Sequence, residues 1–284
     1  MKHSYMKLTY TEESCINLNR REQTRRKWNS RIVCALLMLL HLCTSVQAQH
    51  STRVEDYVDF NLEIANNHLW RGIEVSDGLV MCTALALHDK NSHFTLGLWS
   101  GTNSSGDYKE LNFFGEVKAG GWKLALWDTY NFSPGADYNN REFFNYSAHS
   151  TGRFLDCILS YSFTEAVPRF PLTLSCSTIL FGRDRWKDNR SNRYSCYLSA
   201  EYPLFKNDKW CFEAGVGGTF TWASQKGDKS TFYSDKPGLI HLQLRAQRNV
   251  KLAKNYAIPL FACAVFNPVM ERAFFQIGAQ VFSF

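Results

Sequence analysis

The residue types that could carry out catalysis are sparse in this 284-residue sequence. His149 and Ser150 lie side by side in a polar stretch and offer a base next to a nucleophile. Such a pair needs a third group to orient the base, and no G-x-S-x-G segment accompanies it. The sequence also lacks the H-E-x-x-H, Walker and G-x-G-x-x-G motifs. We expect a protein that is not an enzyme and uses no cofactor, with lipid hydrolysis by His149 and Ser150 as a less favoured alternative.

A second set of chemically active side chains alternates with apolar residues along the chain. Mixed charges on one face of a sheet could line an enclosed interior and set the field of a pore. They could equally pair with one another and close that interior. The residues predicted to line it are Asp59, Glu63, Glu116, Lys118, Asp156, Glu201, Glu213, His241 and Arg245.

The elements that must position these residues are strands. In the segment "GLIHLQLRAQRNVKLA", residues 238–253, apolar and polar side chains alternate almost without error. Successive side chains of an extended chain point to opposite faces, so this segment predicts a strand with one apolar and one polar face. About twelve such segments occur, most of them about 9–11 residues long, which is the length of a tilted membrane-crossing strand. They begin near Tyr57, Leu79, His93, Tyr108, Trp122, Arg153, Pro171, Arg193, Trp210, Gly238, Tyr256 and Ala273.

The connections between these segments alternate between short and long. Short ones such as "HDKNS", "GG", "KND" and "AKN" lie between longer ones such as "TNSSGD" and "SPGADYNNREFFNYSAHST". Outer-membrane barrels show this asymmetry, with tight periplasmic turns and longer outer loops. Tyr and Trp near strand ends suit the aromatic girdles of such barrels: Tyr57, Trp99, Trp122, Tyr130, Tyr194, Tyr202, Trp210, Trp222 and Tyr256.

The last strand ends in Phe284, the terminal residue that outer-membrane barrels carry as an assembly signal. In this strand Phe275 and Ile277 share the apolar parity, whereas Phe282 and Phe284 have the opposite parity. A bulge or bend before the end would bring the two sets onto one face.

The first 48 residues differ from the rest. A basic stretch, the apolar run "IVCALLMLLHLCTSV" and small residues before position 49 predict a cleaved secretory signal.

The first 48 residues hold 8 of the 32 Lys and Arg and 3 of the 26 Asp and Glu, so the rest of the chain carries a formal charge of only +1. A nearly neutral chain argues against nucleic-acid binding. The six remaining cysteines are scattered without C-x-x-C spacing, as small apolar strand residues would be.

Three segments carry a family resemblance. "NNHLWRGIEVSDG", residues 66–78, resembles the first-strand exit of the TorF-type porins, with Trp70, Arg71 and Gly72 matching. "STGRFLDCILSYSF" and "SDKPGLIHLQLRAQRNVKL" are similar to further segments of that Gram-negative outer-membrane barrel family. The resemblance implies a porin-like barrel and brings neither a substrate nor a catalytic residue.

Together these observations predict an all-β fold: a transmembrane, antiparallel, up-and-down β-barrel of about 12 strands over residues 49–284, after a leader of residues 1–48. The strands of a soluble sandwich or lipocalin-like barrel also alternate between apolar and polar residues, but they are shorter on average and their outer polar face is rich in Lys and Glu.

We expect a location in the bacterial outer membrane and passive passage of small polar solutes. Lipid and lipopolysaccharide and the barrel-assembly machinery are the other expected partners. A non-conducting structural or surface-binding barrel is the alternative function.

Overall fold

The computed structural model describes residues 54–147, 150–253 and 256–283. The predicted leader and signal, His149 and Phe284 therefore lie outside the described residues. After a 3-10 turn at Val54–Asp56, the elements are β1 (Val58–Ala65), β2 (His68–Trp70), β3 (Ile73–Ser76), β4 (Val80–His88), β5 (Phe94–Asn103), β6 (Lys109–Ala119), β7 (Trp122–Asn131), β8 (Arg153–Ser162), β9 (Thr173–Gly182), β10 (Ser195–Lys206), β11 (Trp210–Thr221), β12 (Gly238–Ala253), β13 (Tyr256–Asn267) and β14 (Arg272–Ser283).

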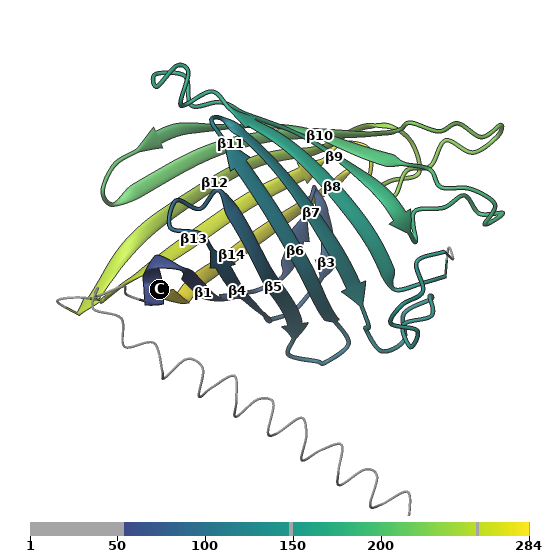
Figure 1. Cartoon of the computed structure of the whole chain (residues 1–284), viewed down its shortest axis with the longest axis horizontal. Coiled ribbons are helices and arrows are strands. Elements are labelled where there is room, and N and C mark those ends of the chain that lie inside the picture. The colour runs from purple at the N-terminus through teal and green to yellow at the C-terminus, as the bar shows by residue number, and fades with distance from the viewer. Residues whose placement is uncertain (1–53, 148–149, 254–255, 284) are drawn as a thin grey trace, which may run out of the picture. The chain divides into compact units, whose positions relative to one another are not determined.

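Twelve of these strands form one closed antiparallel barrel. Each of β4 to β14 pairs with its neighbour in sequence, and β1 closes the sheet by pairing with both β4 and β14 (Figure 1). The predicted fold class is thus confirmed. All twelve begin within two residues of the predicted starts. The sequence did not predict β2 and β3, a separate two-stranded sheet between β1 and β4.

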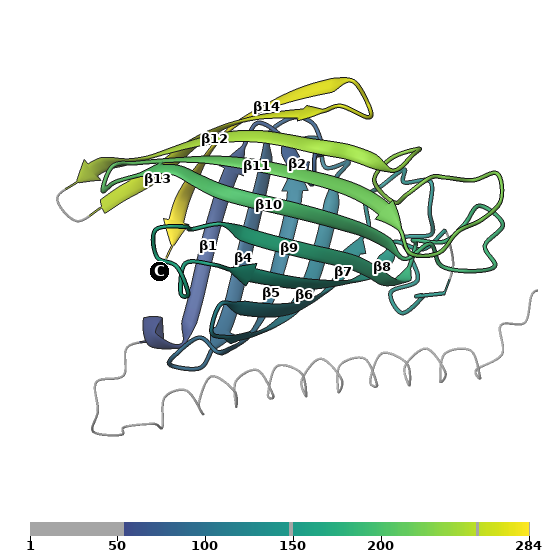
Figure 2. The ribbon, with the colours of Figure 1, turned by 90° about the horizontal axis from the view of Figure 1, so that it is seen from above.

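The two ends of the barrel differ. At one end most described turns are short, such as the Gly120–Gly121 pair between β6 and β7, and the longest connection there is residues 163–172. At the other end lie longer segments, including residues 66–79, 132–147 with 150–152, 183–194 and 222–237 (Figure 2). We refer to these as the short-turn end and the long-loop end. In the part of the chain that the structure describes, no helix is long and apolar enough to cross a membrane.

Strand register separates the residues into two faces. Glu63 pairs with Cys82, Cys82 with Gly101 and Gly101 with Glu110, so these positions share one face. The intervening positions form the opposite face, where large apolar side chains such as Leu96 (69% exposed), Leu124 and Leu244 are open. The polar face therefore lines the lumen, and the apolar face is the outer surface of the barrel.

A bulge near the end of β14 returns Phe282 to the outer face. Glu63 pairs with Gln280 but Leu62 pairs with Phe282, so Val281 is the extra residue. The ring of Phe282 consequently contacts Phe60 edge-on, with centroids 5.8 Å apart. This is the bulge that the conflict of parity predicted, because only an added residue can move Phe282 to the outer face.

The long connection between β7 and β8 covers part of the outer face. Asp128 and Arg153 have outward parity, yet Arg153 is fully buried. The guanidinium group of Arg153 pairs with Asp128 at 3.0 Å and lies 3.8 Å from the ring centre of Phe143. Its Nε donates to the backbone oxygen of Phe143 at 2.6 Å. Residues 132–147 and 150–152 thus shield an ion pair that would otherwise face outward at the long-loop end.

The aromatic residues at strand ends divide into two groups. Trp122, Trp222 and Tyr256 are exposed on the outer surface, as girdle residues would be. Trp99 was wrongly expected there, because its register places it on the lumen face. Tyr130 is buried and stacks on Phe132, within the connection that covers Arg153.

Candidate functional site

The residues 66–79 form a hairpin that enters the lumen at the long-loop end, and we call it the lumen hairpin. Its strands β2 and β3 pair through Leu69–Glu74 and Trp70–Ile73. Two lumen-facing side chains of the barrel bind its backbone. Asn267 Nδ2 donates to the oxygen of Gly72 at 3.0 Å, and Gln276 Nε2 donates to the oxygen of Asn67 at 2.8 Å. Both bonds fix the hairpin against the β13–β14 side of the wall.

The tip of the lumen hairpin is the segment Trp70–Arg71–Gly72. Arg71 and Gly72 have φ angles of 49° and 79°, a left-handed conformation that favours glycine. A Cβ atom at Gly72 would lie 2.0 Å from the backbone oxygen of Ile240 in β12. Glycine is therefore required here both by the turn and by the close contact with the barrel wall.

Arg71 anchors this tip to the opposite wall. Its Nη2 donates to Asp156 Oδ2 of β8 at 2.5 Å and to Ser177 Oγ of β9 at 2.8 Å. Its Nη1 donates to the hydroxyl of Tyr233, in the loop before β12, at 2.5 Å. The guanidinium group also lies 5.2 Å from the ring centre of Tyr197. Because the pair with Asp156 is almost entirely buried, removing one partner would leave an uncompensated charge in the lumen.

An apolar cluster supports the anchor at the long-loop end. The buried side chains of Phe154, Ile179, Tyr197, Tyr233 and Ile240 pack together, and Trp70 packs against them. This cluster combines side chains of four barrel strands (β8, β9, β10 and β12), one loop and the hairpin, so the hairpin is part of the packed interior of the barrel.

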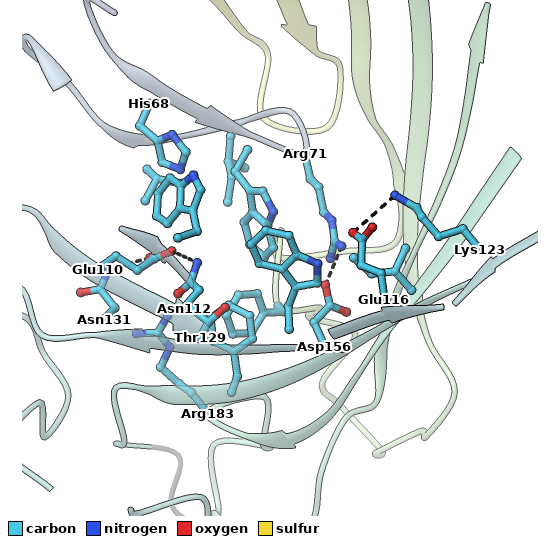
Figure 3. A pocket seen from close by; sticks show the side chains of 18 residues that line it. His68, Arg71, Glu110, Asn112, Glu116, Lys123, Thr129, Asn131, Asp156 and Arg183 are labelled. Atoms are coloured by element: carbon cyan, nitrogen blue, oxygen red, sulfur yellow. Dashed lines mark hydrogen bonds and ion pairs between the residues drawn. The ribbon is translucent and has the colours of Figure 1, made fainter. Parts of the chain in front are cut away.

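Between the lumen hairpin and the wall formed by β5–β8 lies a cavity of about 450 Å³, which we call the inner cavity (Figure 3). Its aromatic walls include Trp70, Trp99, Trp127 and Phe154. Its polar groups come mainly from β6 and β7, and Figure 3 shows them pointing toward the hairpin. They are Glu110, Asn112, Glu116, Lys123, Thr129 and Asn131.

A larger space of about 790 Å³, the outer chamber, lies toward the long-loop end. Its lining includes Glu74, Asp77, Asp107 and Tyr138. The two spaces are adjacent, and we call the boundary between them the neck. Five residues line both spaces there: Ile73, Val75, Asn131, Arg183 and Phe232. A small solute entering from the long-loop end would pass this neck to reach the inner cavity.

The structure places the nine predicted lining residues on the lumen face but does not bring them into one site. Asp156 and Glu116 line the inner cavity. Glu116 pairs with Lys118 and Lys123, each at 3.7 Å. Glu201 and Glu213 line a separate space of about 580 Å³ near the short-turn end.

The other four predicted residues lie elsewhere on the lumen wall. Asp59 is 3.5 Å from the His88 ring nitrogen, and His241 Nδ1 is 2.6 Å from the hydroxyl of Tyr197. Arg245 lies opposite Glu213 in the register and 4.0 Å from the ring centre of Phe261. Glu63 lies opposite Gln280.

Sequence reasoning missed several residues of the inner cavity and its neck. Lys123 and Asn131 lie in a strand, and their parity could have identified them. Arg71 and Arg183 lie in connections, where no periodicity operates. The resemblance of the W-R-G segment to the TorF-type porins identified Arg71 as a residue shared with that family, but it gave no contact or function for this side chain. Among the residues that the structure describes, no group of three or more His, Cys, Asp or Glu could hold a metal ion.

Comparisons with known proteins do not place the chain in a family. No family model matches the chain. No curated protein matches it either. A solved structure, an outer membrane channel from Pseudomonas putida, is similar with a TM-score of 0.43 and 11% identity, over 82% of this chain and all of that one. This likeness is too distant to place the chain in a family, and membership of the TorF-type porins stays a prediction.

Proposed function

We propose that the protein is an outer-membrane β-barrel of a Gram-negative bacterium and allows small polar solutes to pass through its lumen without a cofactor. The observation that carries this proposal is the pair of adjacent spaces in the closed barrel. The outer chamber and the inner cavity share a boundary, the neck, to which the lumen hairpin contributes Ile73 and Val75. Charged and amide side chains on their walls suit polar solutes.

The outer surface supports a membrane location. Large apolar side chains are exposed along successive strands at outward positions, for example Leu87, Leu96, Leu159 and Leu244. Each would gain about 1.5–3 kcal/mol on leaving water completely, so many together favour hydrocarbon over water. A contiguous apolar band flanked by Trp and Tyr is typical of outer-membrane barrels.

A non-conducting barrel is the second candidate, and the anchor of the lumen hairpin favours it. The Arg71–Asp156 pair and the apolar cluster around Tyr233 fill part of the lumen at the long-loop end. If the hairpin stays in place permanently and the short-turn end is also closed, the barrel would carry no current.

Single-channel recording in planar bilayers separates the two candidates. The refolded protein is first checked for heat-modifiable migration on a gel, which shows that the barrel has formed. Discrete current steps from the wild-type barrel would support passage. Silence from folded wild type, together with steps from a variant in which residues 66–79 are replaced by a short turn, would support closure by the hairpin. Silence from both would contradict the proposed passage.

A further inference from the structure

The inner cavity contains buried polar atoms that have no partner. Asn112 is 5% exposed, and its Nδ2 donates to Glu110 Oε1 at 2.9 Å. Its Oδ1 has no hydrogen-bond partner among the described residues. An unsatisfied buried polar atom destabilises a protein, so this oxygen indicates a missing hydrogen-bond donor. Because the amide nitrogen is already bound to Glu110, the free end of Asn112 can only accept.

The neck provides the complementary group. Arg183 lies where the inner cavity meets the outer chamber, and its guanidinium group is 3.9 Å from the ring centre of Tyr138. Its Nη1 is buried and has no hydrogen-bond partner in the described part of the chain. A guanidinium nitrogen held in this way is a strong donor to a carboxylate.

The aromatic walls of the inner cavity favour a flat apolar body. Trp70 and Trp99 line the cavity from the hairpin and from β5, and Phe154 lines it from β8. Trp127 lines it from β7 and is held by Phe114, with ring centres 4.5 Å apart and planes inclined by 12°. Aromatic walls of this kind stack on rings.

We propose that the inner cavity binds a small ring-bearing carboxylate that also carries a hydroxyl group. The carboxylate accepts a hydrogen bond from Arg183 Nη1 at the neck. The ring lies against the tryptophans, and the hydroxyl donates to Asn112 Oδ1 or to Asp156 Oδ1, which also lacks a partner among the described residues. A sugar acid fits less well, because it brings several hydroxyl groups to a cavity whose exposed lining surface is mainly apolar, where those without a hydrogen-bond partner weaken binding.

This inference deepens the proposed function, because it names the class of solute. Binding requires entry from the outer chamber but not passage through the barrel. A barrel that conducts current but does not bind the ring-bearing carboxylate would overturn the proposed ligand class, and the proposed passage of solutes would remain. A barrel that binds this carboxylate but gives no current steps in planar bilayers would overturn the proposed passage of solutes, and the proposed ligand class would remain.

Isothermal titration calorimetry of the folded protein in detergent tests the ligand class with 4-hydroxybenzoate as the probe. We expect benzoate, which lacks the hydroxyl, and 4-hydroxybenzyl alcohol, which lacks the carboxylate, each to bind about tenfold or more weakly, since one such hydrogen bond contributes about 1.4 kcal/mol. Glucuronate should bind more weakly than 4-hydroxybenzoate. No binding of 4-hydroxybenzoate, equal affinities across the series, or a preference for glucuronate would overturn the proposal.

Two variants assign the contacts. Arg183→Gln should weaken binding of 4-hydroxybenzoate about tenfold or more and leave binding of 4-hydroxybenzyl alcohol unchanged. The matched control is Arg185→Gln in the same loop, whose guanidinium group bonds Asn189 and Asn192. Asn112→Leu should reduce the preference for 4-hydroxybenzoate over benzoate. Unchanged affinities in both Arg183→Gln and Asn112→Leu would contradict the assignment, and the ligand series on wild type remains decisive if a variant does not fold.

Discussion

Replacing Arg71 with alanine should release the tip of the lumen hairpin. The guanidinium group bonds Asp156, Ser177 and Tyr233, and its pair with Asp156 is almost entirely buried. Removing one member of a buried ion pair typically costs about 3–5 kcal/mol, because the remaining charge has lost its partner. A loss of about 3 kcal/mol lowers the ratio of anchored to released hairpin about a hundredfold.

The effect should be visible in single-channel recordings as larger or more frequently fluctuating current steps than those of wild type. The thermal midpoint of the folded barrel, followed by heat-modifiable migration, should also fall. Arg141→Ala, at an exposed position in the long connection, is the control and should behave as wild type.

A double variant separates the anchor from the cost of the buried charge. In Arg71→Leu with Asp156→Leu, no unpaired charge remains, so the thermal midpoint should recover toward that of wild type. The bonds to Ser177 and Tyr233 are still lost, so the altered current should persist. Wild-type currents and a wild-type midpoint in Arg71→Ala would refute the claim that this arginine holds the hairpin in the lumen.

Three further outcomes follow from the same structure. Gly72→Ala should reproduce the altered currents of Arg71→Ala, because a Cβ atom there would collide with the barrel wall; unchanged currents would show that the tip sits elsewhere. Burial lowers the pKa of His68 in the hairpin to about 4 from 6.5, so the neutral ring favours the anchored hairpin, and this contribution is lost as the pH falls from 6.5 toward 4. Currents should therefore increase over that range in wild type and respond less in His68→Gln, and an equal response of the two proteins would contradict the assignment. Arg153→Ala should expose Asp128 and loosen residues 132–147 and 150–152, so that limited proteolysis cuts these residues faster than in wild type while the barrel strands stay intact; equal cleavage rates would argue against the shielded ion pair.

The strands could be predicted from the sequence because each contains its own signal. The alternation of apolar and polar residues along β12 identifies its two faces from that segment alone. In β14, the opposite parity of Phe275 and Phe282 indicated the bulge before the end of the strand. Local turn residues mark where strands stop. These features depend on neighbours in the chain, which a single sequence displays.

The site could not be predicted to the same extent, because its contacts join distant parts of the chain. Arg71 bonds Asp156 and Tyr233, which are 85 and 162 residues away. Parity identified Asp156 as a lumen residue, yet nothing local indicates that its partner comes from a connection between two strands. Arg153 shows the reverse case: its outward parity was readable, but its burial depends on how residues 132–147 and 150–152 fold over it.

The central claim is that the apolar face of the strands meets lipid and the polar face encloses the lumen. Spin labels at Thr95→Cys and Leu96→Cys, with the six strand cysteines replaced, test it directly in liposomes, because these adjacent residues of β5 have opposite parity. The label at position 96 should be accessible to oxygen and shielded from a nickel chelate, whereas the label at position 95 should show the lower oxygen accessibility of the two. The reverse pattern, or equal access of the nickel chelate to both labels, would contradict the membrane barrel.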